Sequence, residues 1–321
     1  MPHSSLSRRE VMSAAAIGSV GLALAPIIPA FAKKAAAKSG AAPAPITKPV
    51  PSTGEMLPVI GLGTNQYGVD TAEAMAPLQQ VLETMVELGG SVVDTARAYG
   101  RSEEVIGDLV RRMGNRDRLF ISTKTPMRGD LDSPESEIQA SFDRLKVDRI
   151  DLMLIHNLFG LDQFMPVLLK EKEKGRIRYV GMSTSTDEQY AAQMDGMRRY
   201  PLDFIQVDYS IANRNAADAI LPLARERKMA VLVNVPFGGR RGAAAVFGRV
   251  ANRPLPDFAA DIDATSWAQF FLKYVVSHPA VTAAIPGTTK VANLIDNQGA
   301  GRGRLPDAAM RQEMERYWDA L

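Results

Sequence analysis

The spacing of apolar positions alternates regularly along the chain from Pro58 onward. Short runs rich in β-branched residues, typical of buried strands, are followed by segments in which apolar residues recur every three or four positions, as in amphipathic helices. The predicted strands lie at 58–61, 91–93, 119–123, 150–155, 177–181, 204–207, 230–235 and 281–285. The predicted helices lie at 72–88, 102–113, 134–145, 161–174, 187–198, 216–228, 265–277 and 290–297.

This alternation predicts parallel βαβ units, and eight of them predict closure into a (β/α)8 TIM barrel rather than an open sheet. Before the first strand, the turn sequence Pro51-Ser52-Thr53-Gly54 divides residues 46–57 into a short β-hairpin, which we expect to plug the bottom of the barrel. Residues 306–318 predict an extra C-terminal helix. We find no internal boundary and predict one barrel domain over residues 46–321.

Composition narrows the classes of function. The chain has 321 residues, which is enough for a barrel of about 250 residues and a leader. A formal net charge of +2 without a basic block gives no indication of a nucleic-acid partner. The absence of cysteine excludes disulfides, thiolate metal sites and a cysteine nucleophile. The three histidines are scattered, so we predict no metal site.

The first 32 residues have the pattern of a twin-arginine signal peptide. Arg8 and Arg9 precede an apolar stretch at 14–28, and Ala30-Phe31-Ala32 is typical of a cleavage site. The alternatives are a disordered tail or an uncleaved anchor, but the apolar stretch is shorter than the ~20 residues of a spanning helix. We predict export by the twin-arginine machinery to the periplasm, with no membrane anchor after cleavage. Residues 33–45 are an Ala/Lys/Pro linker.

Residues capable of chemistry follow three successive predicted strands. Asp94 directly follows the predicted strand at 91–93, Lys124 follows the strand at 119–123, and His156 follows the strand at 150–155. Tyr99 lies in the loop after Asp94. Active sites of (β/α)8 barrels are built at these strand ends. We therefore predict that Asp94, Tyr99, Lys124 and His156 form the catalytic group, which we call the tetrad.

Several stretches resemble the aldo-keto reductase family. They lie at 59–64, 93–103, 121–124, 141–156, 175–183, 206–210 and 285–289, in the order found in that family. The resemblance implies NAD(P)H-dependent interconversion of carbonyls and alcohols on a (β/α)8 barrel. It covers nearly the whole chain after the leader.

The chemistry of the tetrad agrees with that activity. Carbonyl reduction requires a hydride, which belongs to the cofactor, and a proton donor at the carbonyl oxygen, which Tyr99 can supply. A free phenol is too weak an acid for this task, and a nearby ammonium such as Lys124 strengthens it. Asp94 would keep Lys124 charged, and the resemblance gives His156 the role of orienting the substrate oxygen. Alternatively, Asp94 and Lys124 form a structural ion pair, Tyr99 packs as an aromatic, and His156 is structural.

The resemblance also implies a nucleotide site. Ser183 and Gln206 correspond to ligands of the nicotinamide amide, and Tyr209 to the aromatic on which the ring stacks, although Tyr209 could instead be a core aromatic. Backbone N–H groups around Gly287 and Thr288, at the start of the helix at 290–297, offer a phosphate site. The remaining predicted cofactor residues are Gly63, Thr64, Pro236, Phe237, Gly238, Lys290 and Asn297.

Some positions depart from the family pattern. Gly287 and Asn293 stand where many NADPH-using members have a lysine and an arginine. We predict NADPH, with NADH as the alternative, and expect Lys290, or Arg302 and Arg304, to supply the positive charge. Asn65 replaces a tryptophan that often lines the substrate pocket. The apolar wall is then expected from one or more of four aromatic residues: Tyr67, Phe159, Phe164 and Phe237.

Two classes of function follow. The first is an oxidoreductase that reduces a small carbonyl compound, and the second is a nucleotide-binding redox sensor or interaction protein without turnover. The complete tetrad favours the enzyme, because a binding-only protein needs no proton donor. A sugar-binding barrel without cofactor is a third and weaker alternative. Since free NADPH is not expected outside the cytoplasm, we expect the exported protein to carry tightly held nucleotide or to have a partner that regenerates it.

Overall fold

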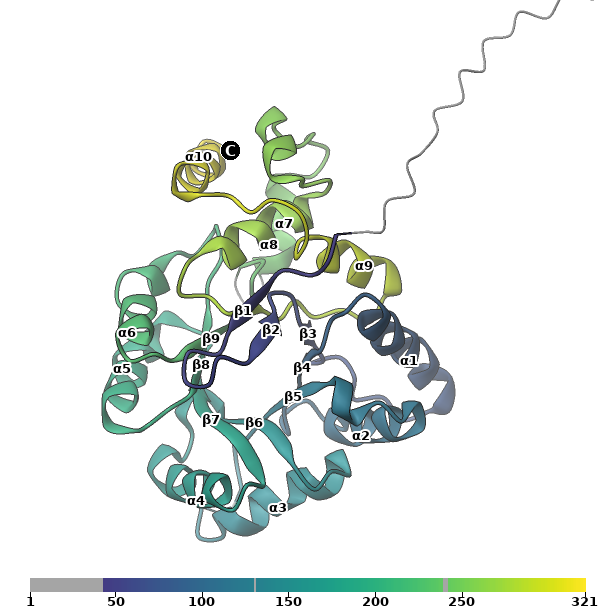
Figure 1. Ribbon diagram of the computed structural model, residues 1–321, viewed down its shortest axis with the longest axis vertical. Coiled ribbons are helices and arrows are strands. Elements are labelled where there is room, and N and C mark those ends of the chain that lie inside the picture. The colour runs from purple at the N-terminus through teal and green to yellow at the C-terminus, as the bar shows by residue number, and fades with distance from the viewer. Residues whose placement is uncertain (1–42, 130, 239–241) are drawn as a thin grey trace, which may run out of the picture. The chain divides into compact units, whose positions relative to one another are not determined.

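A computed structural model describes residues 43–129, 131–238 and 242–321. The predicted signal peptide and most of the linker lie outside the described residues. The described part is a ring of parallel strands surrounded by helices (Figure 1). None of its helices is long and apolar enough to cross a membrane.

The central sheet has eight strands in the order β10-β9-β8-β7-β6-β5-β4-β3, and all neighbours are parallel. The first and last strands also pair, through the bridges Ile60↔Ala284 and Gly63↔Gly287, so the sheet closes on itself. The predicted (β/α)8 barrel is confirmed. The strands are β3 Leu62–Gly63, β4 Val92–Asp94, β5 Phe120–Lys124, β6 Ile150–Ile155, β7 Ile177–Ser183, β8 Phe204–Asp208, β9 Ala230–Asn234 and β10 Ala283–Ala284.

Ten α-helices occur in the described chain. They are α1 Ala72–Glu87, α2 Ser102–Met113, α3 Pro134–Leu145, α4 Leu161–Glu173, α5 Tyr190–Arg199, α6 Ile220–Glu226, α7 Gly242–Arg249, α8 Trp267–Ser277, α9 Val291–Gly299 and α10 Ala308–Asp319. The extra C-terminal helix is therefore confirmed as α10. The predicted helices at 187–198 and 216–228 begin as the 3-10 turns η3 Asp187–Gln189 and η4 Asn215–Ala217, and α7 was not predicted.

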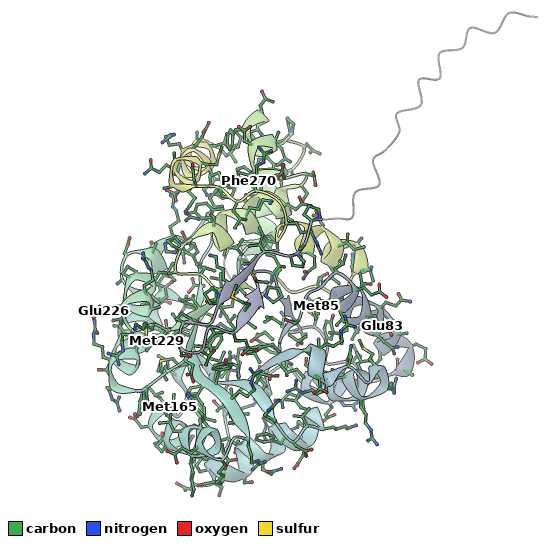
Figure 2. The ribbon with its side chains drawn as sticks, viewed as in Figure 1. Glu83, Met85, Met165, Glu226, Met229 and Phe270 are labelled. Atoms are coloured by element: carbon green, nitrogen blue, oxygen red, sulfur yellow. The ribbon has the colours of Figure 1, made fainter. Side chains whose placement is uncertain are left out.

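Two apolar layers hold the barrel together. Successive side chains of a strand point to opposite faces, so in β6 Leu152 and Leu154 belong to the inner cluster, while Met153 and Ile155 pack toward the helices. The outer layer includes Met85, Met165 and Phe270, all buried, whereas Glu226 is exposed (Figure 2).

The N-terminal hairpin closes one end of this barrel. Strands β1 Thr47–Pro49 and β2 Met56–Pro58 pair antiparallel, as the turn sequence predicted. Val50 and Leu57 join the inner cluster, which includes Phe120 and Phe204 of the barrel strands. The hairpin therefore covers the bottom of the barrel and leaves the C-terminal strand ends for the site.

Candidate active site

The strand ends bring the four tetrad residues together. The Lys124 ammonium donates to Asp94 Oδ2 at 2.6 Å and to the Thr95 carbonyl at 2.9 Å. Its Nζ lies 5.2 Å from the centre of the Tyr99 ring, and the Tyr99 hydroxyl is one of its hydrogen-bond partners. The rings of Tyr99 and His156 meet edge to face, with centroids 6.0 Å apart. A proton donor, a cation and an imidazole thus share one site.

The charges of this group are fixed by their surroundings. Lys124 and Asp94 are 1% and 2% exposed. Burial by itself lowers the pKa of Lys124, but the negative charge of Asp94 and the Tyr99 hydroxyl outweigh it, so that the net pKa of Lys124 lies above its ordinary value. The side chain therefore remains a cation beside the phenol.

Asp94 receives two more hydrogen bonds on its other oxygen. Ser122 Oγ and Gln206 Nε2 each donate to Asp94 Oδ1 at 2.9 Å. The main chain of Asp94 is held as well, because the N–H and hydroxyl of Thr64 both donate to its carbonyl at 3.0 Å. Burial of a carboxylate is costly unless it is hydrogen-bonded, and here both of its oxygens have partners.

His156 starts a turn with unusual backbone geometry. It begins η2 His156–Leu158, and its N–H donates to Thr125 Oγ1 at 3.2 Å. The next two residues, Asn157 and Leu158, have φ angles of 48° and 62°. Non-glycine residues rarely adopt this left-handed conformation, and when they do they cluster at functional sites.

Ser183 and Gln206, the predicted ligands of the nicotinamide amide, both have hydrogen-bond partners within the protein. Ser183 Oγ donates to the Ile155 carbonyl and accepts from the Asn157 N–H, both at 3.2 Å. Gln206 is used at both ends, because its Nε2 bonds to Asp94 and its Oε1 accepts from Asn234 Nδ2 at 3.3 Å. Neither assignment is tested by these contacts, and both stay predictions.

Asn234 is a site residue that was not predicted. It ends β9, and its Nδ2 donates to the Thr184 carbonyl at 2.8 Å. Its Oδ1 is buried and has no hydrogen-bond partner among the described residues. The next residue, Val235, has φ 49°, which is a strained conformation for a β-branched side chain. A polar residue at a strand end was the available signal, but an Asn between valines gives no indication of its partners.

Tyr209 follows β8 and lies in a packed polar cluster. The side chain is 1% exposed and stacks on Tyr274 at 5.9 Å between ring centroids. Its hydroxyl accepts from Arg311 at 2.6 Å and is 3.1 Å from the Tyr274 hydroxyl. These contacts fit the core-aromatic alternative, and the stacking of Tyr209 on the nicotinamide ring stays a prediction.

The predicted phosphate-binding residues lie at the closure of the barrel. Gly63 of β3 forms a parallel bridge with Gly287, which lies in the segment after β10. A Cβ on Gly287 would come within 2.9 Å of Asn65 Oδ1, which is the end of a side chain that can move aside. Thr288 Oγ1 accepts from the Lys290 N–H at 3.1 Å, just before α9.

The other predicted cofactor residues surround this closure or lie further along the chain. Lys290 is exposed, and Asn297 is buried in the last turns of α9, seven positions later on the same side of the helix. Pro236 and Gly238 are buried and Phe237 is half-buried in the loop after β9. Gly239, which follows Gly238 in the sequence, lies outside the described residues.

Comparison with known proteins identifies the family. The model of the aldo/keto reductase family matches residues 59–315. The chain belongs to the aldo/keto reductase family. Among its relatives, the Schizosaccharomyces pombe aldo-keto reductase yakc, whose name carries NADP(+), is 26% identical over 311 residues, 81% of this chain and 88% of that protein. Aldo-keto reductase YhdN of Bacillus subtilis is 30% identical over 186 residues, 53% of this chain and 54% of that protein.

Solved structures of the family have the same fold. An aldo/keto reductase from Klebsiella pneumoniae, crystallised in complex with NADP and acetate, is 26% identical with a TM-score of 0.67. The match covers 83% of this chain and 93% of that chain. Family membership and these matches support an oxidoreductase.

The apolar wall of this aldo/keto reductase differs in part from expectation. Tyr67 and Phe164 are fully buried core residues and are not exposed to a substrate, because their side chains face the packed interior. Phe159 and Phe237 are half-buried. Met127, which was not predicted, is 37% exposed in the loop after Lys124, and its sulfur lies 3.8 Å from Asn157 Nδ2.

Two predicted sources of positive charge have protein partners. Arg302 donates to the main-chain carbonyls of Pro43 and Leu88, and Arg304 pairs with Asp263 at 2.8 Å. Lys290 has no ion-pair partner among the described residues. Of the three cations expected to bind the phosphate that distinguishes NADPH from NADH, Lys290 therefore fits that role best.

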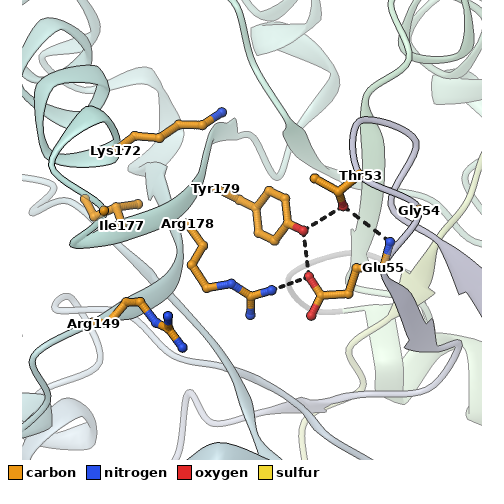
Figure 3. Close-up of a pocket in the computed structure, with 9 residues that line it drawn as sticks. Thr53, Gly54, Glu55, Arg149, Lys172, Ile177, Arg178 and Tyr179 are labelled. Atoms are coloured by element: carbon orange, nitrogen blue, oxygen red, sulfur yellow. Dashed lines mark hydrogen bonds and ion pairs between the residues drawn. The ribbon is translucent and has the colours of Figure 1, made fainter.

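A large cavity of about 890 Å³ opens at the other end of the barrel (Figure 3). Glu55 of the hairpin pairs there with Arg178 and accepts from the Tyr179 hydroxyl at 2.6 Å, while Thr53 bonds to the same hydroxyl at 2.7 Å. These groups lie at the N-terminal ends of the strands, and the tetrad lies at the C-terminal ends. Despite its size, this cavity is lined by none of the tetrad residues. Within the described residues no group of His, Asp and Glu is arranged to hold a metal ion.

Proposed function

We propose that this chain reduces an aldehyde or ketone to an alcohol, reversibly, with NADPH as hydride donor and NADH as the alternative. One observation carries the proposal: the buried Lys124–Asp94 pair contacts Tyr99, and His156 meets the same phenol. The names of yakc and of the Klebsiella pneumoniae complex, both of which carry NADP, support the choice of nucleotide.

The residues of the site fit a nicotinamide nucleotide. A buried acceptor without a partner costs about 1–3 kcal/mol, and Asn234 Oδ1 is such an acceptor among the described residues, suited to a carboxamide N–H. Ser183 lies on the neighbouring strand end. Gly287, Thr288 and Lys290 precede α9, where backbone N–H groups suit a phosphate. The nucleotide, when bound, supplies the hydride.

The chain's own residues handle the proton. Tyr99 donates from its hydroxyl to the carbonyl oxygen as charge develops there, and it takes the proton back in the reverse direction. Lys124 stabilises the resulting phenolate because its ammonium is held beside the phenol by Asp94. His156, with its ring edge-on to Tyr99, orients the carbonyl oxygen between the two groups. Half-buried Phe159 and exposed Met127 offer apolar contact to the rest of the substrate.

The second candidate, a nucleotide-binding sensor without turnover, predicts the same binding and no reaction. The experiment is to titrate NADPH and NADH by fluorescence and then to assay a panel of aldehydes and ketones. We expect binding of NADPH and oxidation of NADPH that depends on the carbonyl compound. Tight binding without turnover on the whole panel would favour the sensor. Failure to bind either nucleotide would contradict both.

We further propose that residues 1–32 direct export of the folded protein by the twin-arginine machinery to the periplasm. The motif around Arg8 and Arg9 supports this. Because that route carries folded proteins, the chain can leave with nucleotide bound. Replacement of both arginines by lysine should retain the protein in the cytoplasm. A protein that is exported equally well after this change does not use the route.

A further inference from the structure

Tyr99 stands on a loop whose two ends meet. The loop begins at Thr95, directly after β4, and ends at Ser102, the first residue of α2. Thr95 and Ser102 are fully buried, and their hydroxyl oxygens lie 2.9 Å apart. Tyr99, between them, is half-buried. A hydrogen bond between two side chains therefore closes the loop that carries the phenol.

A third buried hydroxyl joins this contact from the end of β3. Thr64 Oγ1 lies 3.1 Å from Ser102 Oγ, and the Thr64 carbonyl accepts from Ser102 Oγ at 3.0 Å. The Thr64 hydroxyl itself donates to the Asp94 carbonyl at 3.0 Å. We call Thr64, Thr95 and Ser102 the hydroxyl cluster. All three residues are 0% exposed, and hydrogen bonds in such an interior are stronger than in water.

The single hydrogen of each hydroxyl fixes the direction of these bonds. Thr64 uses its hydrogen on the Asp94 carbonyl, and Ser102 uses its own on the Thr64 carbonyl. Within the described chain, Ser102 Oγ is the acceptor in reach of the Thr95 hydroxyl, so Thr95 is the donor of that bond. The hydroxyl cluster thus ties the start of the Tyr99 loop to its end, and the end to the main chain after β3.

The first residue of α2 also holds the main chain of Tyr99. The Ser102 N–H donates to the Tyr99 carbonyl at 3.2 Å, and the Tyr99 N–H donates to the Ala96 carbonyl at 3.0 Å. Because the Tyr99 carbonyl is bonded to Ser102, a shift of Ser102 moves the residue that carries the phenol.

The same turn of α2 is tied to the strand of Lys124. Glu103 Oε1 accepts from Thr123 Oγ1 at 2.7 Å, and Thr123 directly precedes Lys124 in β5. The Thr95 carbonyl accepts from the Lys124 ammonium at 2.9 Å. The residues at the two ends of the loop therefore relate the proton donor to the cation beside it.

We propose that Thr95 and Ser102 are positioning residues for Tyr99, and that the bond between their hydroxyls holds the phenol in its place beside Lys124. The ammonium lies 5.2 Å from the centre of the Tyr99 ring. The rate of a reaction depends steeply on such placement, since a displacement of about 1 Å can cost about 100-fold. This inference rests on the proposed reductase function.

Two substitutions of Thr95 separate its hydroxyl from its packing. Thr95→Val keeps the shape and removes the hydroxyl, whereas Thr95→Ser keeps the hydroxyl and removes a buried methyl group. Ser102→Ala removes the other side of the bond. Thr282→Val is the matched control, because the buried Thr282 hydroxyl lies before β10, at the hairpin end of the barrel, and accepts from the Val231 N–H at 3.1 Å. The measurements are kcat and KM for one accepted aldehyde with saturating NADPH, the Kd of NADPH, and the Tm.

We expect Thr95→Val and Ser102→Ala to lower kcat by about 10- to 100-fold, with KM and the Kd of NADPH within about threefold of wild type. Thr95→Ser should recover most of this kcat although its Tm falls. Thr282→Val should lower the Tm and leave kcat within about twofold. The double variant of Thr95→Val with Ser102→Ala should lose no more than the larger single loss, because both changes remove the same bond. The kcat then follows the hydroxyl and the Tm follows packing, which a purely structural role would not produce.

The inference is overturned if Thr95→Val keeps the kcat of wild type, or if Thr95→Ser loses as much kcat as Thr95→Val. It is also overturned if Thr282→Val loses kcat to the same extent, or if the two losses add in the double variant. Should Thr95→Val fail to fold, an unchanged kcat in Ser102→Ala is the result that overturns it. Wild-type protein that binds no nucleotide would contradict the proposed function itself, and that result is seen before any variant is made.

Discussion

Asp94 and Lys124 form an ion pair that water does not reach. Removing charges from water is costly, and it is compensated here by hydrogen bonds to both oxygens of the carboxylate. The pair therefore contributes little net stability as long as it is intact. The role of the pair in the proposed reaction is to hold the Lys124 ammonium beside Tyr99.

Lys124→Met tests whether the buried carboxylate depends on its cation for stability. The change leaves Asp94 as a buried carboxylate without its cation, so we expect the free energy of unfolding to fall by about 3–5 kcal/mol. Turnover should fall with it, because no cation remains beside Tyr99. Urea denaturation and steady-state kinetics measure the two effects.

The double variant Asp94→Asn with Lys124→Met separates stability from chemistry. It removes both charges, and we expect most of the lost stability to return while turnover stays low. Recovery of turnover in the double variant would show that the charge of Lys124 is not used in the reaction.

The sequence predicted the tetrad because strand ends of a barrel converge whatever the loops do. Asp94 and Lys124 end β4 and β5, His156 directly follows β6, and each of these strand ends is fixed by an apolar run. Tyr209 follows β8 in a loop, where spacing does not determine the direction of a side chain, and it lies against Tyr274. The partners of Gln206 were also beyond prediction, since they come from the opposite side of the ring.

At the scale of elements, the closure between β3 and β10 is formed by the two shortest strands of the sheet. Strands β3 and β10 have two residues each, and two isolated bridges join them. The sequence predicted longer strands at 58–61 and 281–285. Apolar runs indicate burial, but pairing also depends on the twist of the neighbours, so strand lengths at the closure could not be predicted.

Gly63→Ala should weaken this closure. A Cβ on Gly63 would approach the Ile285 carbonyl to 2.8 Å and Gly287 Cα to 3.3 Å, and main-chain atoms cannot move aside easily. We expect a loss of about 1–3 kcal/mol, seen as a lower Tm. Gly287→Ala is the matched variant, because its Cβ meets only the end of the Asn65 side chain and should cost less stability. Equal losses in both variants would argue against the closure as the cause.

The end of α8 should make stability depend on pH through His278. Burial, with nearby Arg311 and Lys48, lowers the pKa of His278 from 6.5 to about 4. Its Nδ1 accepts from the Ala280 N–H at 3.2 Å, which only the neutral ring can do. Between these two pH values the unfolded chain binds a proton that the folded chain does not. Stability should therefore fall as the pH drops from 6.5 toward 4.

We expect a loss of about 2 kcal/mol between pH 7 and pH 4.5 from this group, after allowance for partial exposure of the ring. Urea denaturation at both pH values measures it. His278→Asn keeps an acceptor for the Ala280 N–H but does not titrate, so it should lose this part of the pH dependence. An unchanged dependence in that variant would assign the effect to other groups.

At the scale of the molecule, the two ends of the barrel have different tasks. The hairpin end carries the ion pairs of Arg178 with Glu55 and Asp151, and the other end carries the tetrad. In (β/α)8 barrels the C-terminal strand ends support chemistry and the N-terminal ends support stability. The eight-unit pattern predicted this division, because it follows from parallel strands alone.

Arg178→Met should therefore affect stability and leave chemistry intact. Asp151 is buried and keeps Arg116 as a partner at 2.7 Å, so we expect a moderate loss of about 1–3 kcal/mol. The kcat and the Kd of NADPH should remain within about twofold of wild type. Thermal melts and kinetics on the same sample test this, and a large fall in kcat would mean that the two ends are coupled.

The central claim is that Tyr99 donates the proton in a nucleotide-dependent carbonyl reduction. The most direct test is kcat for one accepted aldehyde with saturating NADPH, in wild type and in Tyr99→Phe, with the Kd of NADPH measured for both. Loss of the general acid should lower kcat by at least about 100-fold while the Kd changes little, because the phenyl ring still fills the site. If Tyr99→Phe reduced the aldehyde at the wild-type rate with normal nucleotide binding, Tyr99 would not be the donor, and the role assigned to Lys124 beside it would be wrong as well.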